Sequence, residues 1–354
     1  MSENHKPNSY SGRMLVSGDE YLARKNGQNF SSKKPSPKKS FPVRLVIIAV
    51  CAVVFCVSGY HLVRYFSDIH QSRSSTESLR EIYAASQLQE TQAPISSTAG
   101  EPSVSPAQTP QAAQNFAGDA EEPQHTPEKF SDLWPSQYKN NPELLISESF
   151  NGLRAENRDI IGWINIEGVL DEPVVQRDNE FYLNHDATQK KNVTGALFLD
   201  ENCNLRTMTP NLIIHGHNMK EGAMFGVLKK YKLKDASFYK SHPFIQFNTL
   251  YEESTYVIFA VTEISLNPSN HYYLPFWNYL EFDSENNYNN FINRVREYSH
   301  FQTGVDVRPG DRLLTLATCA GTDNADRLLI VARQVREGED TIELQRGILS
   351  TTVK

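Results

Sequence analysis

Cysteine is scarce in this sequence, with four among 354 residues, which excludes a scaffold held together by disulfides. The chain also lacks a CxxC pair, an HExxH motif, an Asp-rich loop and any internal repeat, the usual signs of metal sites and repeat folds. Its formal net charge of −7 argues against a nucleic-acid binder with a basic surface. Its mean hydropathy of −0.50 excludes a protein with many membrane spans.

Charge is unevenly distributed along the chain. Residues 1–44 contain nine Lys and Arg residues against three Asp and Glu residues, a net charge of +6, which leaves −13 for everything after residue 44. Pro, Ser, Asn and Gly are scattered through this segment without periodicity. Such a composition predicts a disordered basic tail.

One uncharged run follows the basic tail. Residues 45–63 read LVIIAVCAVVFCVSGYHLV, and 19 residues at 1.5 Å each form a helix of roughly 28 Å, close to the thickness of a bilayer core. Basic residues crowd its N-terminal side, which places the N-terminus in the cytoplasm and the rest outside. A cleaved signal peptide is the alternative, but this run is long for one and more than 40 residues precede it. We therefore predict a single transmembrane helix.

Residues 64–130 are polar and rich in proline. The first part, to about residue 89, is compatible with a polar juxtamembrane helix that carries Ile69, Leu79, Ile82 and Tyr83. Six prolines follow, and no Lys or Arg lies between residues 80 and 129. This composition cannot bury a core, so we predict an extracellular stalk that acts as a tether.

The remaining residues, 131–354, are richer in aromatic and β-branched side chains and have the length of one compact domain. Leu144, Leu145, Phe150 and Leu153 have roughly helical spacing within residues 143–158, and a capped apolar stripe predicts a second helix near 284–299. Eight short apolar runs predict strands, and many short strands in one domain favour a closed or nearly closed β-barrel. The runs are GWINIE, EPVVQ, GALFLD, NLIIHGH, PFIQFN, TYVIFAVTEI, DRLLTLATC and RLLIVARQV.

Two histidines end one of these runs. His215 and His217 lie two residues apart, and alternate residues of a strand share a face, so the pair is compatible with metal chelation. A metal site needs further ligands at matching positions, and no motif supplies them. A pair of polar histidines at a strand end is the other interpretation of this run taken alone.

A cysteine and an arginine lie where the last two runs meet. Cys319 closes an apolar strand, a position where a rigid element meets a loop and nucleophiles are common, although a single cysteine at a strand end is more often an inert buried thiol. Arg327 follows eight residues later and begins the next run, so a hairpin would bring both side chains to one rim of the barrel. A guanidinium fixed there would hold a developing oxyanion or a substrate carbonyl, whereas a solvated surface arginine is the alternative. Pairing of Cys319 with Cys203 stays open.

Together these segments resemble the class B sortases, the membrane-anchored transpeptidases of Gram-positive surfaces. The resemblance covers roughly residues 143–337, and its most specific part is TLATC followed by Arg eight residues later, with GHNM upstream. It implies a mainly β fold, an eight-stranded barrel with N-terminal helices and an extra helix before the last two strands. Further matching runs are NRDIIGWINIEG, EPVVQRDNEFYLNHD, GALFLDENC, FGVLKKY and the closing R-x-x-x-V-x-R strand with Arg327, Val331 and Arg333.

The resemblance also implies roles for individual residues. It makes Cys319 the nucleophile, His217 the general acid and base, and Arg327 the essential arginine. It places Asn179 and Leu183 where class B enzymes contact the sorting peptide, and it implies neither a cofactor nor a metal.

The implied reaction is cleavage of a C-terminal sorting signal after Thr through a thioacyl-enzyme, with transfer to an amine of a peptidoglycan precursor or of a pilin lysine. Class B membership suggests an NPxTN-like or an (N/S)PxTG-like signal. His215 departs from the family, which often has Tyr there, and Ala317 stands where Ser is common. Rival functions are a zinc-binding protein, a non-catalytic receptor or adhesin on a stalk, and a hydrolase that shares the same acyl-enzyme.

Overall fold

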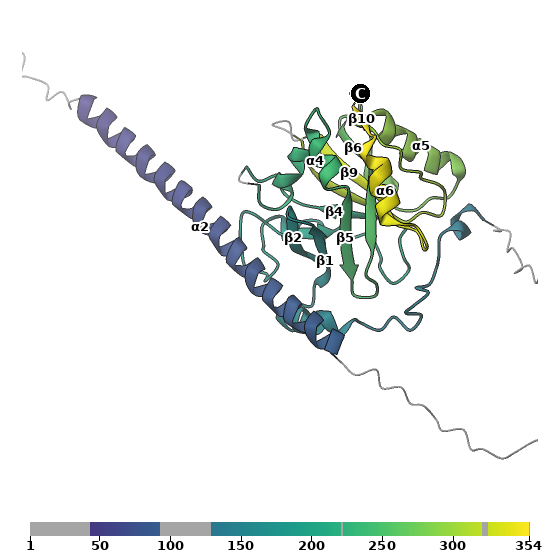
Figure 1. Ribbon diagram of the computed structural model, residues 1–354. Helices are drawn as coiled ribbons and strands as arrows, with labels where there is room; N and C mark the ends of the chain where they lie inside the picture. Colours follow the sequence, from purple (N-terminus) through teal and green to yellow (C-terminus); the bar gives the residue numbers. More distant parts are fainter. Residues whose placement is uncertain (1–42, 93–128, 221, 321–324, 354) are drawn as a thin grey trace, which may run out of the picture. The chain divides into compact units, whose positions relative to one another are not determined.

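The computed structural model describes residues 43–92, 129–220, 222–320 and 325–353 (Figure 1). The chain divides into two compact units, Met1–Tyr60 and His61–Lys354. The described part of the first unit is the N-terminal part of helix α2, and the second unit holds the rest of that helix and the barrel. The basic tail predicted for residues 1–44 lies outside the described residues except at its last two positions.

Helix α2 (Val43–Gln92) contains the uncharged run. Over Val43–Gln89 it is long and apolar enough to cross a membrane, judged by length and composition. The helix continues without a break from the apolar run into the polar segment that the sequence predicts as juxtamembrane helix.

Eight strands close into a barrel in the order β1-β2-β3-β4-β8-β9-β6-β5, and β5 pairs with β1. Each of the eight predicted runs overlaps one of these strands, so the predicted barrel is confirmed. The β2–β3 and β4–β8 pairs are parallel and the other pairs are antiparallel. The strands are β1 (Ile160–Ile166), β2 (Leu170–Val175), β3 (Leu197–Leu199), β4 (Asn211–His215), β5 (Phe244–Thr249), β6 (Thr255–Ser265), β8 (Leu313–Cys319) and β9 (Asp326–Gln334).

The helix predicted before the last two barrel strands is α5 (Glu285–Glu297). The Ser284 side chain accepts a hydrogen bond from the backbone N–H of Asn287 and so caps its first turn. The apolar stripe is buried, as its spacing predicts. The other short elements are η1 (Phe130–Leu133), η2 (Glu148–Phe150), α3 (Asn151–Glu156), η3 (Phe181–Leu183), η4 (Phe225–Lys232), α4 (Ser237–Ser241), η5 (Phe276–Asn278), β7 (Phe301–Gln302), α6 (Thr341–Leu349) and β10 (Thr352–Val353).

The helix predicted over residues 143–158 is shorter than the spacing indicates. Leu144 has a positive φ of 52°, which no right-handed helix contains. Leu145 is 70% exposed, so it belongs to no apolar face. Only η2 and α3 are helical in this region, and the Ser147 side chain caps η2. The predicted N-terminal part of this helix is therefore wrong.

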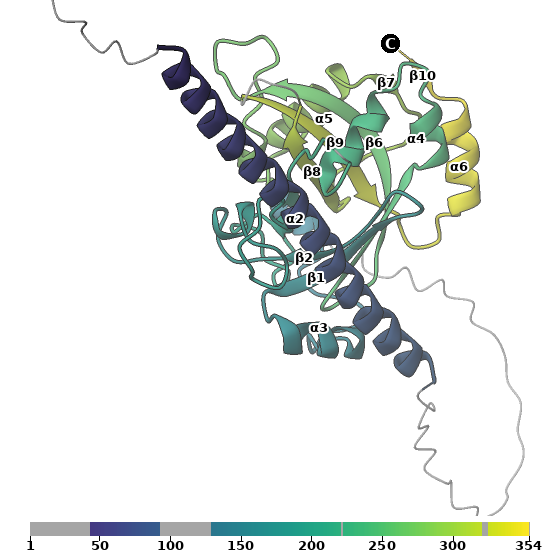
Figure 2. The ribbon, with the colours of Figure 1, turned by 90° about the vertical axis from the view of Figure 1, so that its left-hand side faces the viewer.

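The C-terminal half of α2 packs on the barrel, and Figure 2 shows it running alongside β1 and β2. Ile69, Leu79 and Tyr83 are buried in the same apolar core as the strands, and the Tyr83 ring stacks on Trp163 with centroids 4.8 Å apart. The Arg80 side chain pairs with Asp171 of β2. The helical part of the predicted stalk thus belongs to the folded unit, while residues 93–128 lie outside the described residues and the catalytic domain bounds of 131–354 stay a prediction.

The contact between α2 and β2 predicts a pH dependence of stability. Burial raises the pKa of Glu172 to about 7, although the hydrogen bond from the Thr76 hydroxyl, at 2.9 Å, opposes this. The folded chain therefore holds a proton that the unfolded chain, with an ordinary value of 4.5, has already released. Protonated Glu172 therefore favours the folded state: its contribution to the free energy of unfolding is complete below about pH 4.5 and is lost as the pH rises to about 7.

We expect Glu172→Gln to flatten the fall in the free energy of unfolding between pH 5 and pH 8. Urea unfolding of the full chain in detergent measures it at both values. Glu167→Gln, at an exposed position, is the matched control and should keep the wild-type dependence. An unchanged pH slope in Glu172→Gln would contradict the assignment.

Candidate active site

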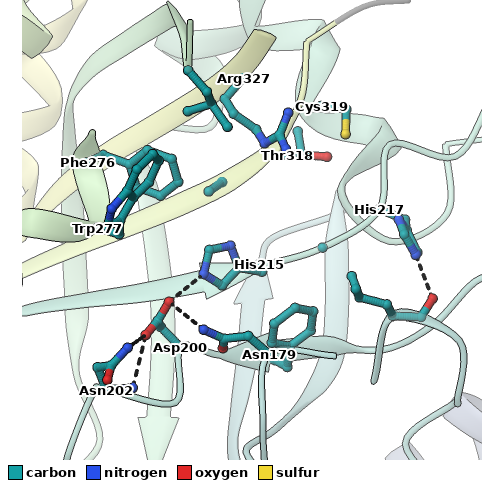
Figure 3. Close-up of a pocket in the computed structure, with 15 residues that line it drawn as sticks. Asn179, Asp200, Asn202, His215, His217, Phe276, Trp277, Thr318, Cys319 and Arg327 are labelled. Atoms are coloured by element: carbon teal, nitrogen blue, oxygen red, sulfur yellow. Dashed lines mark hydrogen bonds and ion pairs between the residues drawn. The ribbon is translucent and has the colours of Figure 1, made fainter. Parts of the chain in front are cut away.

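A pocket of about 400 Å³ lies where β4 and β8 end and β9 begins (Figure 3). Its lining includes all five predicted site residues, so the fold brings together side chains from positions 179 to 327. The lining residues are Asn179, Leu183, Phe198, Asp200, Asn202, His215, Gly216, His217, Leu266, Phe276, Trp277, Ala317, Thr318, Cys319 and Arg327.

Cys319 and Arg327 are direct partners in the antiparallel β8–β9 ladder. Paired residues project to the same face of a sheet, so the thiol and the guanidinium share one rim of the pocket, as the spacing of eight predicts (Figure 3). The Cys319 carbonyl accepts a hydrogen bond of 2.7 Å from the Asn218 side chain. Arg327 Nη1 donates to the carbonyl of Asp326 at 3.0 Å. The hydrogen bond from Asn218, which follows β4, thereby anchors the backbone of Cys319.

His217 follows β4 and lines the same pocket. Its Nε2 lies 2.7 Å from the carbonyl oxygen of Leu183, and because a carbonyl only accepts, Nε2 carries a proton. Figure 3 shows the ring directed at this carbonyl. Gly195 permits the approach: its φ is +61°, and a Cβ there would lie 2.5 Å from the Tyr182 carbonyl oxygen and 3.1 Å from Cδ2 of His217. The loop that contains Leu183 and Gly195 therefore sets the position of the imidazole.

His215 has a different partner, a carboxylate. Its Nε2 lies 3.0 Å from Oδ2 of Asp200, which also accepts from the Asn179 side chain at 3.1 Å. Oδ1 of Asp200 accepts from the backbone and side-chain nitrogens of Asn202, both at 3.0 Å. Burial raises the pKa of Asp200, but hydrogen bonds from His215 and Asn202 outweigh it, and the pKa lies below its ordinary value.

Asp200 is a site residue that sequence reasoning missed. It directly follows β3, and a carboxylate at a strand end is a recognisable signal, but its pairing with His215 depends on the β3–β4 register. The aromatic wall of Phe198, Phe276 and Trp277 was also missed, because η5 lies between β6 and α5 with no motif. This wall makes one side of the pocket apolar.

The predicted peptide contacts, Asn179 and Leu183, both line the pocket. The Asn179 side chain is engaged within the protein, since its amide nitrogen donates to Asp200 and its oxygen accepts from the backbone of Glu201 at 2.9 Å. Leu183 presents a partly exposed side chain and gives its carbonyl to His217. Asn179 therefore shapes the pocket floor through Asp200.

The cysteines of the second unit are both free. Cys203 is buried, and burial raises the pKa of its thiol to about 12. Its sulfur lies 3.4 Å from the backbone nitrogen of Ile213. The pairing with Cys319 that the sequence left open is thus absent from the described structure. No group of three or more His, Cys, Asp or Glu side chains within the described ranges could hold a metal ion.

Comparison with known proteins gives the family. A family model for the sortase domain matches residues 164–335. Sortase B of Listeria monocytogenes is 32% identical over 176 residues, which are 49% of this chain and 68% of that protein. Sortase B of Staphylococcus aureus is 31% identical over 197 residues, 54% of this chain and 76% of that protein. The chain belongs to the class B sortases.

All five predicted site residues lie inside the matched part of this sortase, whereas α2 and α6 lie outside it. Among solved structures, a Staphylococcus aureus sortase B–substrate complex is 28% identical to this sortase. The similarity covers 55% of this chain and 88% of that one, with a TM-score of 0.48.

Proposed function

We propose that this sortase is a cysteine transpeptidase that cleaves the C-terminal sorting signal of secreted proteins after Thr. The observation that carries the proposal is the register pair Cys319–Arg327 at the rim of a pocket that also contains His217. A thiol, an imidazole and a guanidinium that converge on one cavity are suited to acyl transfer through a covalent intermediate. The buried Cys203 lacks such surroundings and serves as an internal contrast.

In the first half-reaction, the Cys319 thiolate attacks the Thr carbonyl, a C–S bond forms and the peptide C–N bond breaks. His217 gives its proton to the departing amine, which completes the balance. In the second half-reaction, an acceptor amine attacks the thioester, a C–N bond forms and the C–S bond breaks. The proton lost by the amine returns to His217, and Cys319 leaves as the thiolate.

Arg327 would stabilise the charge that develops on the carbonyl oxygen, because it projects from the same face as the nucleophile. A planar guanidinium donates two parallel hydrogen bonds, and an ammonium on a flexible stem cannot reproduce that geometry. We expect Arg327→Lys to reduce kcat/KM about 100-fold or more. Steady-state cleavage of a fluorogenic sorting peptide measures it, and a variant within threefold of wild type would remove Arg327 from the mechanism.

The proposal includes partners and location. The acyl donor would be the sorting signal of a secreted surface protein, and the acceptor an amine of a peptidoglycan precursor or of a pilin lysine. The basic residues before the apolar helix support a cytoplasmic N-terminus, a single membrane span and an extracellular catalytic domain. Leu183, with its partly exposed side chain in the pocket, would contact the sorting peptide, while Asn179 would support that contact from the pocket floor.

Capture of the thioacyl-enzyme tests this function. The full chain in detergent is used, because α2 contributes to the barrel core. It is incubated with NPxTN-type and (N/S)PxTG-type peptides, with glycylglycine or Nα-acetyl-lysine as acceptor, and digested for mass spectrometry. We expect an acyl adduct on the peptide that contains Cys319 and none on the one that contains Cys203, followed by transfer to one of the amines. Cleavage without an adduct on Cys319 would overturn the proposal, and water as the preferred acceptor would make the enzyme a hydrolase.

A further inference from the structure

A second imidazole faces the pocket beside the nucleophile. His215 is the register partner of Ala317 in the parallel β4–β8 pair and of Phe198 in the antiparallel β3–β4 pair. Ala317 precedes Cys319 by two residues on β8, so these side chains project to one face. Ala317 contributes only a methyl group, so the imidazole is the polar side chain of this register pair.

Asp200 fixes which nitrogen of this imidazole holds the proton. The carboxylate accepts from His215 Nε2, from Asn179 and twice from Asn202. Because Asn179 and Asn202 together donate three of these hydrogen bonds and the pKa of Asp200 lies below its ordinary value, the carboxylate is ionised and only accepts, so Nε2 of His215 is the donor. In the neutral ring, Nδ1 then presents a lone pair, and no described residue donates a hydrogen bond to it. In Figure 3 the ring edge opposite Asp200 faces the side of Thr318 and Arg327.

Aromatic rings and low solvent exposure surround the lone pair on Nδ1, so it discriminates between ligands with and without a hydrogen-bond donor. The imidazole stacks on Phe198 with centroids 5.2 Å apart, and Phe276 lies 6.2 Å away. The His215 side chain keeps 23% of its exposure, so a peptide that fills the pocket removes the remaining water from Nδ1. An acceptor left without a donor in that state is destabilising, and a site built to receive an N–H rejects an isostere that lacks one.

We propose that the Asp200–His215 pair is a specificity-determining subsite that accepts a hydrogen bond from a side-chain N–H of the sorting peptide. The inference rests on the proposed function and adds to it the chemistry of the residue that is recognised. The subsite lies level with Ala317, two residues from Cys319 and therefore about 7 Å along the strand. The donor accordingly belongs to a side chain within two to three residues of the scissile carbonyl.

The test compares peptides that differ only in a side-chain amide. The probe is Asn-Pro-Gln-Thr-Asn, and its variants replace the first Asn with Leu, the Gln with Met or the last Asn with Leu. With the full chain in detergent, we expect one replacement to lower kcat/KM about tenfold or more in the wild type. In His215→Phe, which keeps the stacked ring and loses both nitrogens, kcat/KM for the parent peptide and for that variant peptide should differ by no more than about twofold.

Asp200→Asn is the second variant, since it leaves the ring in place and removes the charge that fixes its tautomer. Asp200→Asn should also reduce the difference in kcat/KM between the parent and the amide-replaced peptides. It keeps the proposal testable if His215→Phe fails to fold. The inference is overturned if no amide replacement matters in the wild type, or if the discrimination survives in the variants. Absence of an adduct on Cys319 in the wild type would be a failure of the proposed function, whereas an adduct without discrimination that depends on His215 is a failure of this inference alone.

Discussion

Cys319→Ala is expected to abolish the thioacyl adduct and to reduce peptide cleavage on the order of 10⁴-fold or more, because Cys319 carries the only thiol among the described residues that line the pocket. Cleavage of a fluorogenic sorting peptide by the full chain in detergent measures the loss. Cys203→Ala is the matched control: its thiol is buried outside the pocket, so the turnover of its folded fraction should stay at the wild-type value. Wild-type turnover in Cys319→Ala would contradict the mechanism.

The same assay separates the two histidines of the pocket. His217→Ala removes the group proposed to move protons in both half-reactions, and we expect a loss of about 10²–10⁴-fold. His242→Ala is the control, since that ring packs on Phe238 and does not line the pocket. A larger loss in a His215→Ala variant than in His217→Ala would exchange their roles.

Arg333→Met is expected to lower the free energy of unfolding by about 3–5 kcal/mol. The Arg333 side chain is 0% exposed and donates two hydrogen bonds to the carboxylate of Glu339, at 2.6 and 2.7 Å. It also donates to the carbonyl of Asp306 at 2.6 Å. Replacement by an apolar side chain of similar length keeps the volume but removes both hydrogen bonds that Arg333 donates to this partly buried carboxylate, which keeps Arg336 as its remaining partner. Urea unfolding in detergent measures the change.

An exposed ion pair provides the control for Arg333→Met. The side chains of Lys139 and Glu337 are 75% and 82% exposed, and such pairs contribute about 0–1 kcal/mol. Lys139→Met should therefore change stability by less than about 1 kcal/mol. A loss in Arg333→Met no larger than in Lys139→Met would show that the buried network does not stabilise the fold.

Two arginines of β9 have different proposed roles: Arg327 acts in the pocket and Arg333 stabilises the fold. Arg327 and Arg333 lie six residues apart on β9, so they project from the same face. Arg327 lies at the open rim opposite Cys319, whereas Arg333, register partner of Leu313 at the start of β8, is buried. The sequence run that contains both does not distinguish them, because their difference arises from what covers each end of the barrel.

Local patterns were sufficient for the strands and for the Cys319–Arg327 pair. Each strand is a compact apolar run, and eight residues between the cysteine and the arginine fit a hairpin whose register is confirmed. The Asp200–His215 pair was missed because its members meet through strand pairing. The predicted helix over residues 143–158 failed at its start, because apolar spacing carries no information about the positive φ of Leu144.

The packing of α2 on the barrel could not be predicted from the composition of residues 64–92. Its polar segment carries few apolar residues, and Leu79 and Tyr83 are buried in the core that also contains side chains of β1 and β2, which follow about 80 to 95 residues later. In sequence alone, a polar helix with a narrow apolar stripe cannot be distinguished from a flexible tether unless the surface on which it packs is known.

The docked helix has a consequence for release of the enzyme from its anchor. The carbonyl of Asp68 on α2 accepts a hydrogen bond of 2.7 Å from Asn192, and Asn192 pairs with Asn184 and accepts from Gly195, within the loop that supports His217. Proteolytic cleavage between residues 64 and 92 would therefore remove part of the folded unit, and not only a flexible linker. Release at that point would separate the barrel from a helix that contributes side chains to its core.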